Sequence, residues 1–368
     1  MRIGLISISG DPRSLSTWSG TPAHLAAALE EIDGVNIMSC CPLRPATYRA
    51  ARVVSALTAR LGRRVLWEVE PAVGRRYMRT LRRNPDMAAA DRWLFLGCLP
   101  RGSSANDPPI ATWIDSTFAQ RLGRTPWLDR IARRSHRELA IAEREAFTES
   151  TCVLAASNSA LQDVRHRYGV PEERSHLVPF GASLAPDSPV PERASKLPYR
   201  VLSVGVHWHR KGMDLAVATI DALVAGGQPV ELDVVGVDPP SDDWLRPYVR
   251  YHGFISRGPQ LDRLFREADL FLLPSRDEPF GIAFAEAGAY GLPVVGLRVG
   301  GVPDIVVPST GVLLGELATP LDLAGAVGDL LGDQQARAAM AKAARARYED
   351  RFRWSAVAQS ICEILERV

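Results

Sequence analysis

Lysine is scarce in this chain of 368 residues: three of its 44 basic residues are lysines, at Lys196, Lys211 and Lys342. That bias is typical of a GC-rich genome and says little about function. Long hydrophobic runs are absent as well, because no stretch of about 18 apolar residues occurs. Residues 1–10 hold one arginine and a short apolar stretch, which favours a first β-strand over an export signal. We therefore expect a cytoplasmic protein.

Paired cysteines are missing too. The five cysteines form no CxxC pair, and no His/Cys cluster has the spacing of a zinc site. Without an export signal these thiols should stay reduced. No DxD-like motif ends a predicted strand, so we expect neither a metal nor another cofactor. A GxGxxG motif does not follow the first strand, which makes a dinucleotide-binding oxidoreductase the least favoured function.

Acidic residues are rare in one region, residues 44–83, which hold eleven arginines against two glutamates. Such a segment is suited to an anionic acceptor or to peripheral contact with an anionic membrane surface. A solvated helical face in an arginine-rich protein is the plainer interpretation. No pattern of stacking aromatic residues accompanies the charge, so a nucleic-acid partner is not expected.

Short β-branched runs alternate with helical patterns along the chain, which predicts an α/β protein with parallel sheets. Residues 186–198 hold four prolines among thirteen residues and form a predicted linker. It separates a first domain, 1–185, from a second, 199–348. The expected strands are 2–7, 35–39, 110–114, 152–156, 200–204, 230–235, 249–253, 270–273 and 294–297. The expected helices include 129–150, 214–225, 259–267, 281–290 and 321–348, with further helices before a loop at 97–109.

A cationic segment follows the first strand of the second half. Gly205 allows the backbone to come close to a ligand, and Arg210 and Lys211 supply adjacent positive charges just before a helix. Fixed cations and the free N–H groups of a helix N-terminus together suit a diphosphate. A surface pair beside a structural glycine is the alternative interpretation.

The most informative segment, EPFGIAFAE, follows the predicted strand 270–273. Phe280, Gly281 and Ile282 should open a helix, with Glu278 in the loop before it and Glu286 about 6 Å along its axis. The helix N-terminus would bind phosphates, while the two carboxylates would bind hydroxyl groups of the sugar and the ribose. Carboxylates beside a phosphate make sense only as partners of hydroxyls, since they repel the phosphate itself.

Weaker signals come from three other positions. Gly301 belongs to a Gly-Gly turn after strand 294–297, which permits the close passage of a ligand. In the first half, Gly20 follows the first strand. Asp115 follows strand 110–114, where it would orient the acceptor or the sugar.

Together these residues resemble the retaining GT-B glycosyltransferases of family 4. The likeness is strongest in EPFGIAFAEAGAYGLPVV and VGGVPDIV, and it continues in the first half in TWSGTPAHLAAALE, ATWIDSTF, LAASNSALQDV and LVPFGAS. It implies two Rossmann-like domains whose parallel sheets face each other across a cleft. FRWSAVAQSICEIL is similar to the family's closing helix, so residues 349–368 are expected to cross back onto the first domain.

The resemblance also implies roles for individual residues. Glu278 would contact the transferred sugar, Glu286 the ribose, and Arg210 and Lys211 the diphosphate. Many members have Gly-Arg five residues before the lysine, whereas this chain has Gly205-Val206. Arg210 then supplies the second cation, as in a subgroup with a W-x-R-K-G pattern.

The expected reaction is metal-independent transfer of a sugar from a nucleoside diphosphate-sugar, with UDP favoured over GDP, to an acceptor hydroxyl or amine. The acceptor is open among a glycan, a glycolipid and a secondary metabolite. Two other functions also stay open. One is a GT-B sugar-nucleotide epimerase or hydrolase, and the other is a non-catalytic nucleotide-sugar-binding protein.

Overall fold

The computed structural model describes residues 1–7, 10–40, 45–60, 64–97, 100–186 and 196–368. Most of the predicted linker, residues 187–195, and positions 44 and 61–63 of the arginine-rich segment lie outside the described residues. The chain divides into two compact units. Unit 1 is Met1–Phe180 with Trp354–Val368, and unit 2 is Gly181–Arg353.

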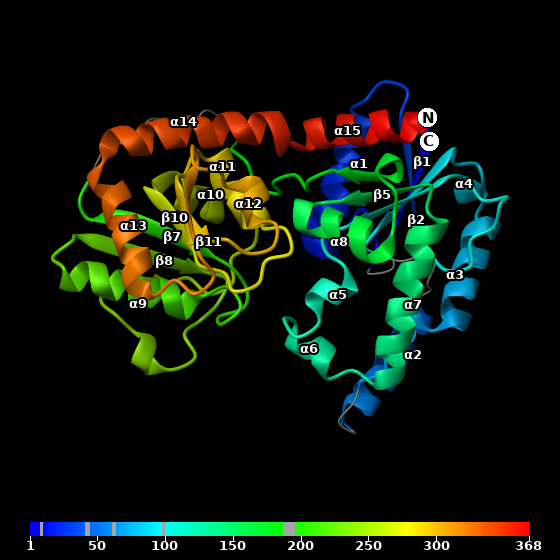
Figure 1. Cartoon of the computed structure of the whole chain (residues 1–368), viewed down its shortest axis with the longest axis horizontal. Helices are drawn as coiled ribbons and strands as arrows, with labels where there is room; N and C mark the ends of the chain where they lie inside the picture. The colour runs from blue at the N-terminus through cyan, green and yellow to red at the C-terminus, as the bar shows by residue number, and fades with distance from the viewer. Residues whose placement is uncertain (8–9, 41–44, 61–63, 98–99, 187–195) are drawn as a thin grey trace. The chain divides into compact units, whose positions relative to one another are not determined.

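Unit 1 is built on a six-stranded parallel sheet with the order β2-β1-β3-β4-β5-β6. Its four inner strands are almost fully buried, because helices cover both faces of the sheet (Figure 1). Trp93 and Phe95 of one central strand pack in the core with Met78 and Leu81. The strands are β1 (Arg2–Ile6), β2 (Asn36–Cys40), β3 (Arg92–Leu96), β4 (Ile110–Ile114), β5 (Cys152–Ala155) and β6 (Ser175–Leu177).

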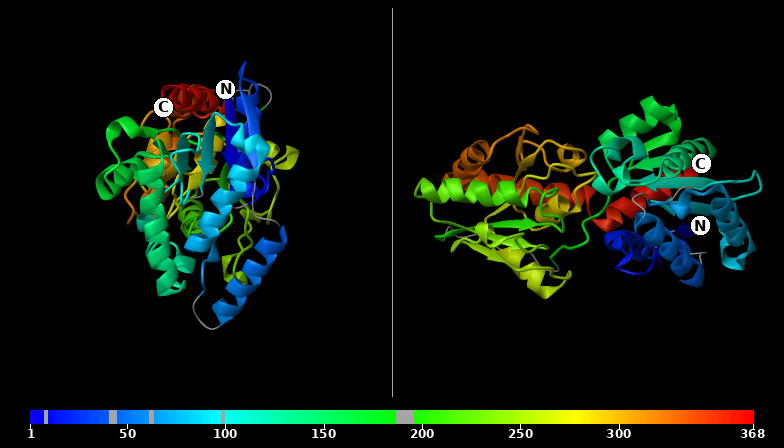
Figure 2. Two further views of the ribbon diagram at one scale, coloured as in Figure 1. Left: turned by 90° about the vertical axis from the view of Figure 1, so that its right-hand side faces the viewer. Right: turned by 90° about the horizontal axis from the view of Figure 1, so that it is seen from below.

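The helices of unit 1 come from both ends of the chain. Helix α15 packs against α1, and both chain termini therefore belong to this unit (Figure 2). The α-helices are α1 (Thr21–Glu30), α2 (Pro45–Arg60), α3 (Pro71–Arg83), α4 (Pro85–Ala88), α5 (Phe118–Arg121), α6 (Pro126–Asp129), α7 (Arg133–Glu149), α8 (Asn158–Tyr168) and α15 (Trp354–Arg367). Short 3₁₀ turns are η1 (Thr17–Gly20), η2 (Trp67–Val69) and η3 (Glu172–Arg174).

Unit 2 has a second six-stranded parallel sheet with the order β12-β11-β10-β7-β8-β9. Helices α9 and α13 pack together, as do α11 and α14. The strands are β7 (Tyr199–Val204), β8 (Val230–Val235), β9 (Val249–Tyr251), β10 (Leu270–Leu273), β11 (Val294–Leu297) and β12 (Gly311–Leu314). The helices are α9 (Met213–Ala225), η4 (Asp242–Trp244), α10 (Pro259–Glu267), α11 (Ile282–Ala289), α12 (Val302–Ile305), α13 (Pro320–Gly332) and α14 (Gln334–Arg351).

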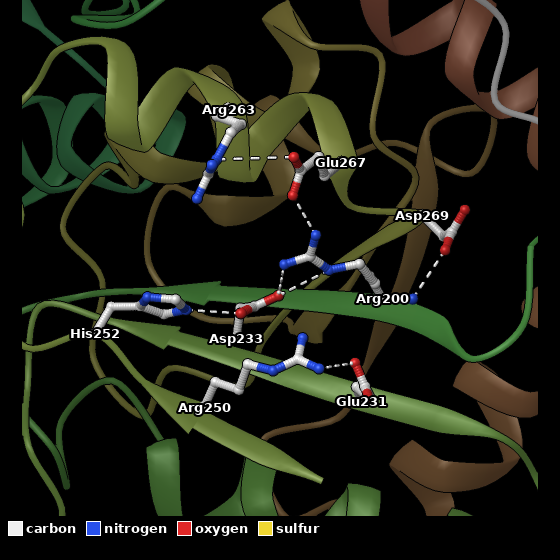
Figure 3. A network of polar contacts seen from close by, with 8 residues as sticks. All are labelled: Arg200, Glu231, Asp233, Arg250, His252, Arg263, Glu267 and Asp269. Carbon is white, nitrogen blue, oxygen red and sulfur yellow. Dashed lines mark hydrogen bonds and ion pairs between the residues drawn. The ribbon is translucent and has the colours of Figure 1, made fainter.

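A charged network ties β7 to β8 and to the end of α10. Arg200 contacts buried Asp233 at 2.7 Å, and His252 contacts the other oxygen of that carboxylate at 2.6 Å. The backbone N–H of Arg200 donates to Asp269 just before β10. The close-up view adds the flanking pairs of this network, made by Glu231, Arg250, Arg263 and Glu267 (Figure 3). Because the buried carboxylate of Asp233 is paired on both oxygens, removal of a partner would leave an uncompensated buried charge, and the network forms no open site.

The predicted α/β class with parallel sheets is confirmed, with differences in detail. Strands β3, β6 and β12 were not predicted. The predicted helix 321–348 is two helices, because Asp333 adopts an extended conformation (φ −104°, ψ 92°) and caps α14 through the N–H of Ala336. The predicted helix 129–150 begins later, at Arg133, since Ala132 donates its N–H to the carbonyl of Arg64.

The unit boundaries also differ from the predicted ranges 1–185, 199–348 and 349–368. Unit 2 begins at Gly181, and the N–H of Ala182 donates to the carbonyl of Phe352 at 2.9 Å. Residues 181–185, which the sequence assigned to the first domain, therefore already belong to unit 2.

Candidate functional site

Three loops meet at the carboxyl ends of adjacent strands in unit 2. They follow β7, β10 and β11, which lie side by side in the sheet. The order of the strands along the chain reverses between β7 and β10, and open α/β sheets bind ligands at such a switch point. The structure thus brings together the three segments that the sequence singled out in its second half.

A buried ion pair joins the first two loops. The ammonium group of Lys211 contacts a carboxylate oxygen of Glu278, and the two side chains are 11% and 7% exposed. The hydroxyl of Ser275 donates to the same oxygen at 3.2 Å. Gly205 makes room for the lysine stem, because a Cβ at that position would lie 2.6 Å from Lys211 Cγ. The glycine is therefore needed by the lysine itself.

Two arginines clamp the same loops together from outside the pair. The guanidinium of Arg210 donates to the carbonyl of Asp277 at 3.1 Å. Arg276 bonds in the opposite direction: its backbone N–H donates to the carbonyl of Arg210, and its guanidinium binds Asp214 at 2.7 Å. Partial desolvation, followed by the charges of Arg210 and Lys211, lowers the pKa of His207. The two cations of this loop therefore act on His207 in the same direction as its burial.

The loop after β10 turns sharply into helix α11. Gly281 precedes the first helical residue, Ile282, with φ 107°, and no side chain of the described residues caps the helix. A Cβ on Gly281 would lie 2.8 Å from the ring of Phe284. Phe280 is buried and packs near Phe352. The first turn thus has backbone N–H groups that are suited to an anion.

The Gly300-Gly301 turn supports the Glu278 loop from the side of β11. Gly300 has φ 50°, and a Cβ there would lie 2.0 Å from the carbonyl oxygen of Glu278. Gly301 donates its N–H to that oxygen at 3.1 Å. The close approach that the sequence predicted for a ligand is thus made in the structure by protein backbone.

Glu286 lies one turn inside α11 and is 3% exposed. Arg257 donates to its carboxylate at 3.0 Å, and the backbone N–H of Leu184 donates to it as well. Burial raises the pKa of Glu286, while Arg257 and then Lys211 act in the opposite direction. Glu286 is therefore held near the pair of Lys211 and Glu278, and Arg257 is its own cationic partner.

The two candidates of unit 1 lie at the carboxyl ends of its own sheet. Gly20 has φ 80° and precedes α1, after Trp18 and Ser19, which also have positive φ. Asp115 follows β4 and accepts a bond from the hydroxyl of Ser116 at 3.1 Å. Burial raises the pKa of Asp115, and the charge of Arg121 opposes that shift.

Comparison with known proteins places this arrangement in a family. The model of the family described as Glycosyl transferases group 1 matches residues 198–333, which contain all three loops of unit 2. The family match, the curated relatives and the solved structures together support a group 1 glycosyltransferase. The predicted family is confirmed in this coarser form.

Relatives and solved structures agree with this assignment. Glycogen synthase of Mycobacterium tuberculosis (strain CDC 1551 / Oshkosh) is 27% identical over 291 residues, which cover 76% of this chain and 68% of that protein. D-inositol 3-phosphate glycosyltransferase of Xylanimonas cellulosilytica is 30% identical over 61% of this chain and 58% of its own length. The structure of Anabaena Alr3699/HepE in complex with UDP superposes with a TM-score of 0.67 and 18% identity, covering both chains completely. The glycosyltransferase has the GT-B fold.

Several residues around the site of this glycosyltransferase were not predicted. Ser275 and Arg276 flank the EPFG motif and could have been suspected from their position. Arg257 and Leu184 contact Glu286 from segments without any motif. Local sequence carries no signal for such partners, because they depend on how distant loops pack.

Metal-binding clusters and membrane-spanning helices are both absent from the described residues. No group of three or more His, Cys, Asp and Glu side chains is arranged to hold a metal ion in the part of the glycosyltransferase that the structure describes. Over the same residues, every helix is either too short or too polar to cross a membrane.

Proposed function

We propose that this glycosyltransferase moves a sugar from a nucleoside diphosphate-sugar to an acceptor hydroxyl or amine, with retention of the anomeric configuration. UDP is the favoured nucleotide and GDP the second. The observation that carries the proposal is the meeting of Lys211, Glu278, Glu286 and the start of α11 at one switch point of unit 2.

The diphosphate is assigned to the cationic side of this arrangement. An ammonium group has three donors, and Lys211 uses one of them on Glu278. The other two donors, the guanidinium of Arg210 and the first N–H groups of α11 suit the oxygens of a diphosphate. The structure of Anabaena Alr3699/HepE holds UDP, which supports a uridine nucleotide for a protein of this fold.

The two carboxylates are assigned to hydroxyl groups at opposite ends of the donor. In the described residues, the bonds from Lys211 and Ser275 both go to Oε2 of Glu278, so Oε1 can accept a bond from a sugar hydroxyl. Glu286, one turn further along α11, suits the ribose diol. Gly205, Phe280, Ile282 and Gly301 shape the walls, and Gly20 is assigned to the loop that reaches the donor.

Stabilisation of the leaving diphosphate is the proposed source of catalysis. Lys211 and Arg210 are held by Glu278 and by the carbonyl of Asp277, so their charges need little reorganisation during the reaction. We propose that no metal or other cofactor is required. Asp115 is assigned to the acceptor in unit 1, because burial raises its pKa and thereby favours proton uptake.

Cytoplasmic location and membrane contact through residues 44–83 stay predictions. Within that segment, Val53, Val54 and Leu57 of α2 are more than half exposed, and five arginines lie on α3. Exposed apolar residues beside arginines suit a peripheral contact with an anionic surface.

A donor screen tests the proposed function. The protein is melted with UDP-, GDP-, TDP- and ADP-sugars, since a ligand at 100 times its Kd stabilises a protein by about 2.7 kcal/mol. A raised Tm with a UDP-sugar, absent from Glu286→Gln, is the expected result. No stabilisation by any of the four donors would refute the proposed donor class.

Product analysis with the donor alone separates the transferase from its alternatives. If free sugar or an epimer forms without acceptor as fast as product forms with it, the protein is a hydrolase or an epimerase and not a transferase. Turnover that survives excess EDTA is expected, and its loss would contradict the metal-independent mechanism.

A further inference from the structure

Unit 1 contains a pocket that the donor site does not use. Its volume is about 440 Å³, within the range of about 300–1,000 Å³ that is usual for small-molecule sites. Gly97 and Asp115, which follow β3 and β4, line it, so it lies at the carboxyl ends of two neighbouring strands. This is the edge of a parallel sheet at which ligands bind.

One side of the pocket is apolar. Phe118 of α5, Leu128 of α6 and Leu66 form a buried cluster, against which Leu139 of α7 and Val69 pack. All five of these side chains also line the pocket. Such a wall gives affinity to an apolar surface, at roughly 25 cal/mol for each Å² removed from water. An aqueous glycan offers little surface of that kind.

The other side of the pocket is polar and contains two carboxyl groups, Asp115 and Glu143, together with two arginines, Arg64 and Arg121. The N–H of Phe118 donates to Glu143 at 2.7 Å, and the hydroxyl of Tyr168 donates to its other oxygen. Glu143 is therefore held in place from the protein side. Asp115 has the hydroxyl of Ser116 as its partner and lies directly after the strand. A hydroxyl or amine of a ligand would meet these carboxyl groups at the end of an apolar wall.

We propose that this pocket binds the acceptor, and that the acceptor is a small amphipathic molecule with an apolar ring body and a hydroxyl or amine directed at Asp115. The proposal rests on the proposed function, because a transferase needs an acceptor in addition to its donor. Of the three acceptor classes left open by the sequence, the pocket favours a small molecule such as a secondary metabolite over a glycan or a glycolipid. The apolar wall disfavours the glycan, and the limited volume disfavours a long lipid chain.

Direct binding of a probe tests the pocket without any turnover. The probe is 4-methylumbelliferone, a fluorescent bicyclic phenol, and binding is followed by fluorescence anisotropy with the full chain. Leu139→Trp fills the pocket from α7 and is expected to weaken binding at least tenfold. Ala140→Trp is the matched control, because Ala140 is the next residue on α7, is exposed and does not line the pocket. Binding to that control should equal binding to the wild type.

The polar end has its own test. Asp115→Asn should lower the rate of glycosylation of the probe and change its pH profile, while leaving the Kd of the probe within a few-fold. Equal binding of the probe by Leu139→Trp and wild type would overturn the proposal. Displacement of the probe by maltotriose, or by phosphatidylglycerol vesicles at lower concentration than by 2-naphthol, would also overturn it in favour of a glycan or a lipid.

The pocket and the donor site can fail separately. Stabilisation by a UDP-sugar without any probe binding would refute the pocket assignment alone. Probe binding that Leu139→Trp abolishes, without stabilisation by any nucleotide-sugar, would refute the donor class and with it the role of the pocket as an acceptor site.

Discussion

The two units share a sheet architecture but differ at the carboxyl ends of their strands. In unit 2 the loops after β7, β10 and β11 are closely packed: Gly300 approaches the carbonyl of Glu278, and Gly205 makes room for Lys211. In unit 1 the loops after β3 and β4 leave a pocket of about 440 Å³ with an apolar wall. Backbone packing thus fixes the charged side chains of unit 2 in place, whereas the loops of unit 1 leave a pocket open.

This difference has a physical meaning for a transferase. A diphosphate is the same in every nucleotide-sugar, so the groups that bind it gain from being rigid and preorganised. Acceptors vary in shape, and a pocket with apolar walls can change its preference through a few side chains. The following variants test whether the rigidity of unit 2 and the openness of unit 1 have these separate functions.

The largest effect is expected from removing the buried cation of unit 2. Lys211→Ala should lower kcat at least a hundredfold, because the loss of one preorganised contact to developing charge costs on the order of 3 kcal/mol. Steady-state kinetics measures it, and circular dichroism checks that the fold is kept. Lys342→Ala, on the exposed side of α14, is the control. A kcat close to that of the wild type would contradict the assigned role of Lys211.

Backbone packing in unit 2 is tested by Gly300→Ala. The new Cβ would lie 2.0 Å from the carbonyl oxygen of Glu278, at a backbone φ of 50° that costs a non-glycine residue about 1–2 kcal/mol before any clash. We expect the free energy of unfolding, measured in urea, to fall by about 2–3 kcal/mol, and donor binding to weaken. Gly315→Ala, where a Cβ has no atom within 4 Å, should behave like the wild type. Equal stability of the two variants would show that the loops are not tightly packed.

The buried carboxyl group of unit 1 predicts how stability depends on pH. Burial raises the pKa of Glu143 to about 7 from an ordinary value of 4.5. The folded state therefore binds the proton more tightly, and stability falls as the pH rises from about 4.5 through 7. Between pH 5.5 and 8 the loss from this group is on the order of 2 kcal/mol. Urea unfolding should show that loss in the wild type, and Glu143→Gln should lack it.

The smallest effect is expected from removing Arg257, the cation that binds Glu286. Arg257 lowers the pKa of Glu286, so Arg257→Ala should raise that pKa and protonate the carboxyl group at higher pH. The KM for the donor should then rise more at pH 6 than at pH 8. Initial rates over this pH range measure it, with Arg263→Ala, 69% exposed, as the control. An unchanged ratio of KM values between the two pH values would argue against a role for Glu286 in donor binding.

Much of unit 2 could be predicted because each of its signals is local. Gly205 and two cations directly follow one predicted strand, and the EPFG segment follows another. Their positions in the sequence therefore place both groups at the carboxyl ends of strands. That Lys211 pairs with Glu278 could not be predicted, because 67 positions separate them and their contact depends on the order of β7 and β10 in the sheet. The same applies to Gly300, whose neighbour belongs to another loop.

Unit 1 was harder to predict for two different reasons. Strand β3 is a run of five residues where helices were expected, just before the predicted loop 97–109, and both of its faces are buried, so it shows no alternation. The pocket is lined by residues from several separate stretches between Arg64 and Glu143, and no motif joins them. Positive φ at Trp18 and Ser19 is also outside what residue preferences predict.

Helix α15 has a consequence for how the molecule is made. Residues Val357, Ile361 and Leu365 are buried, and they belong to the unit that begins at Met1. A ribosome therefore releases every residue of unit 2 before it releases the last helix of unit 1. The unit that comes second in the sequence can finish folding first, and a chain that stops at Arg353 would leave its first unit without a helix.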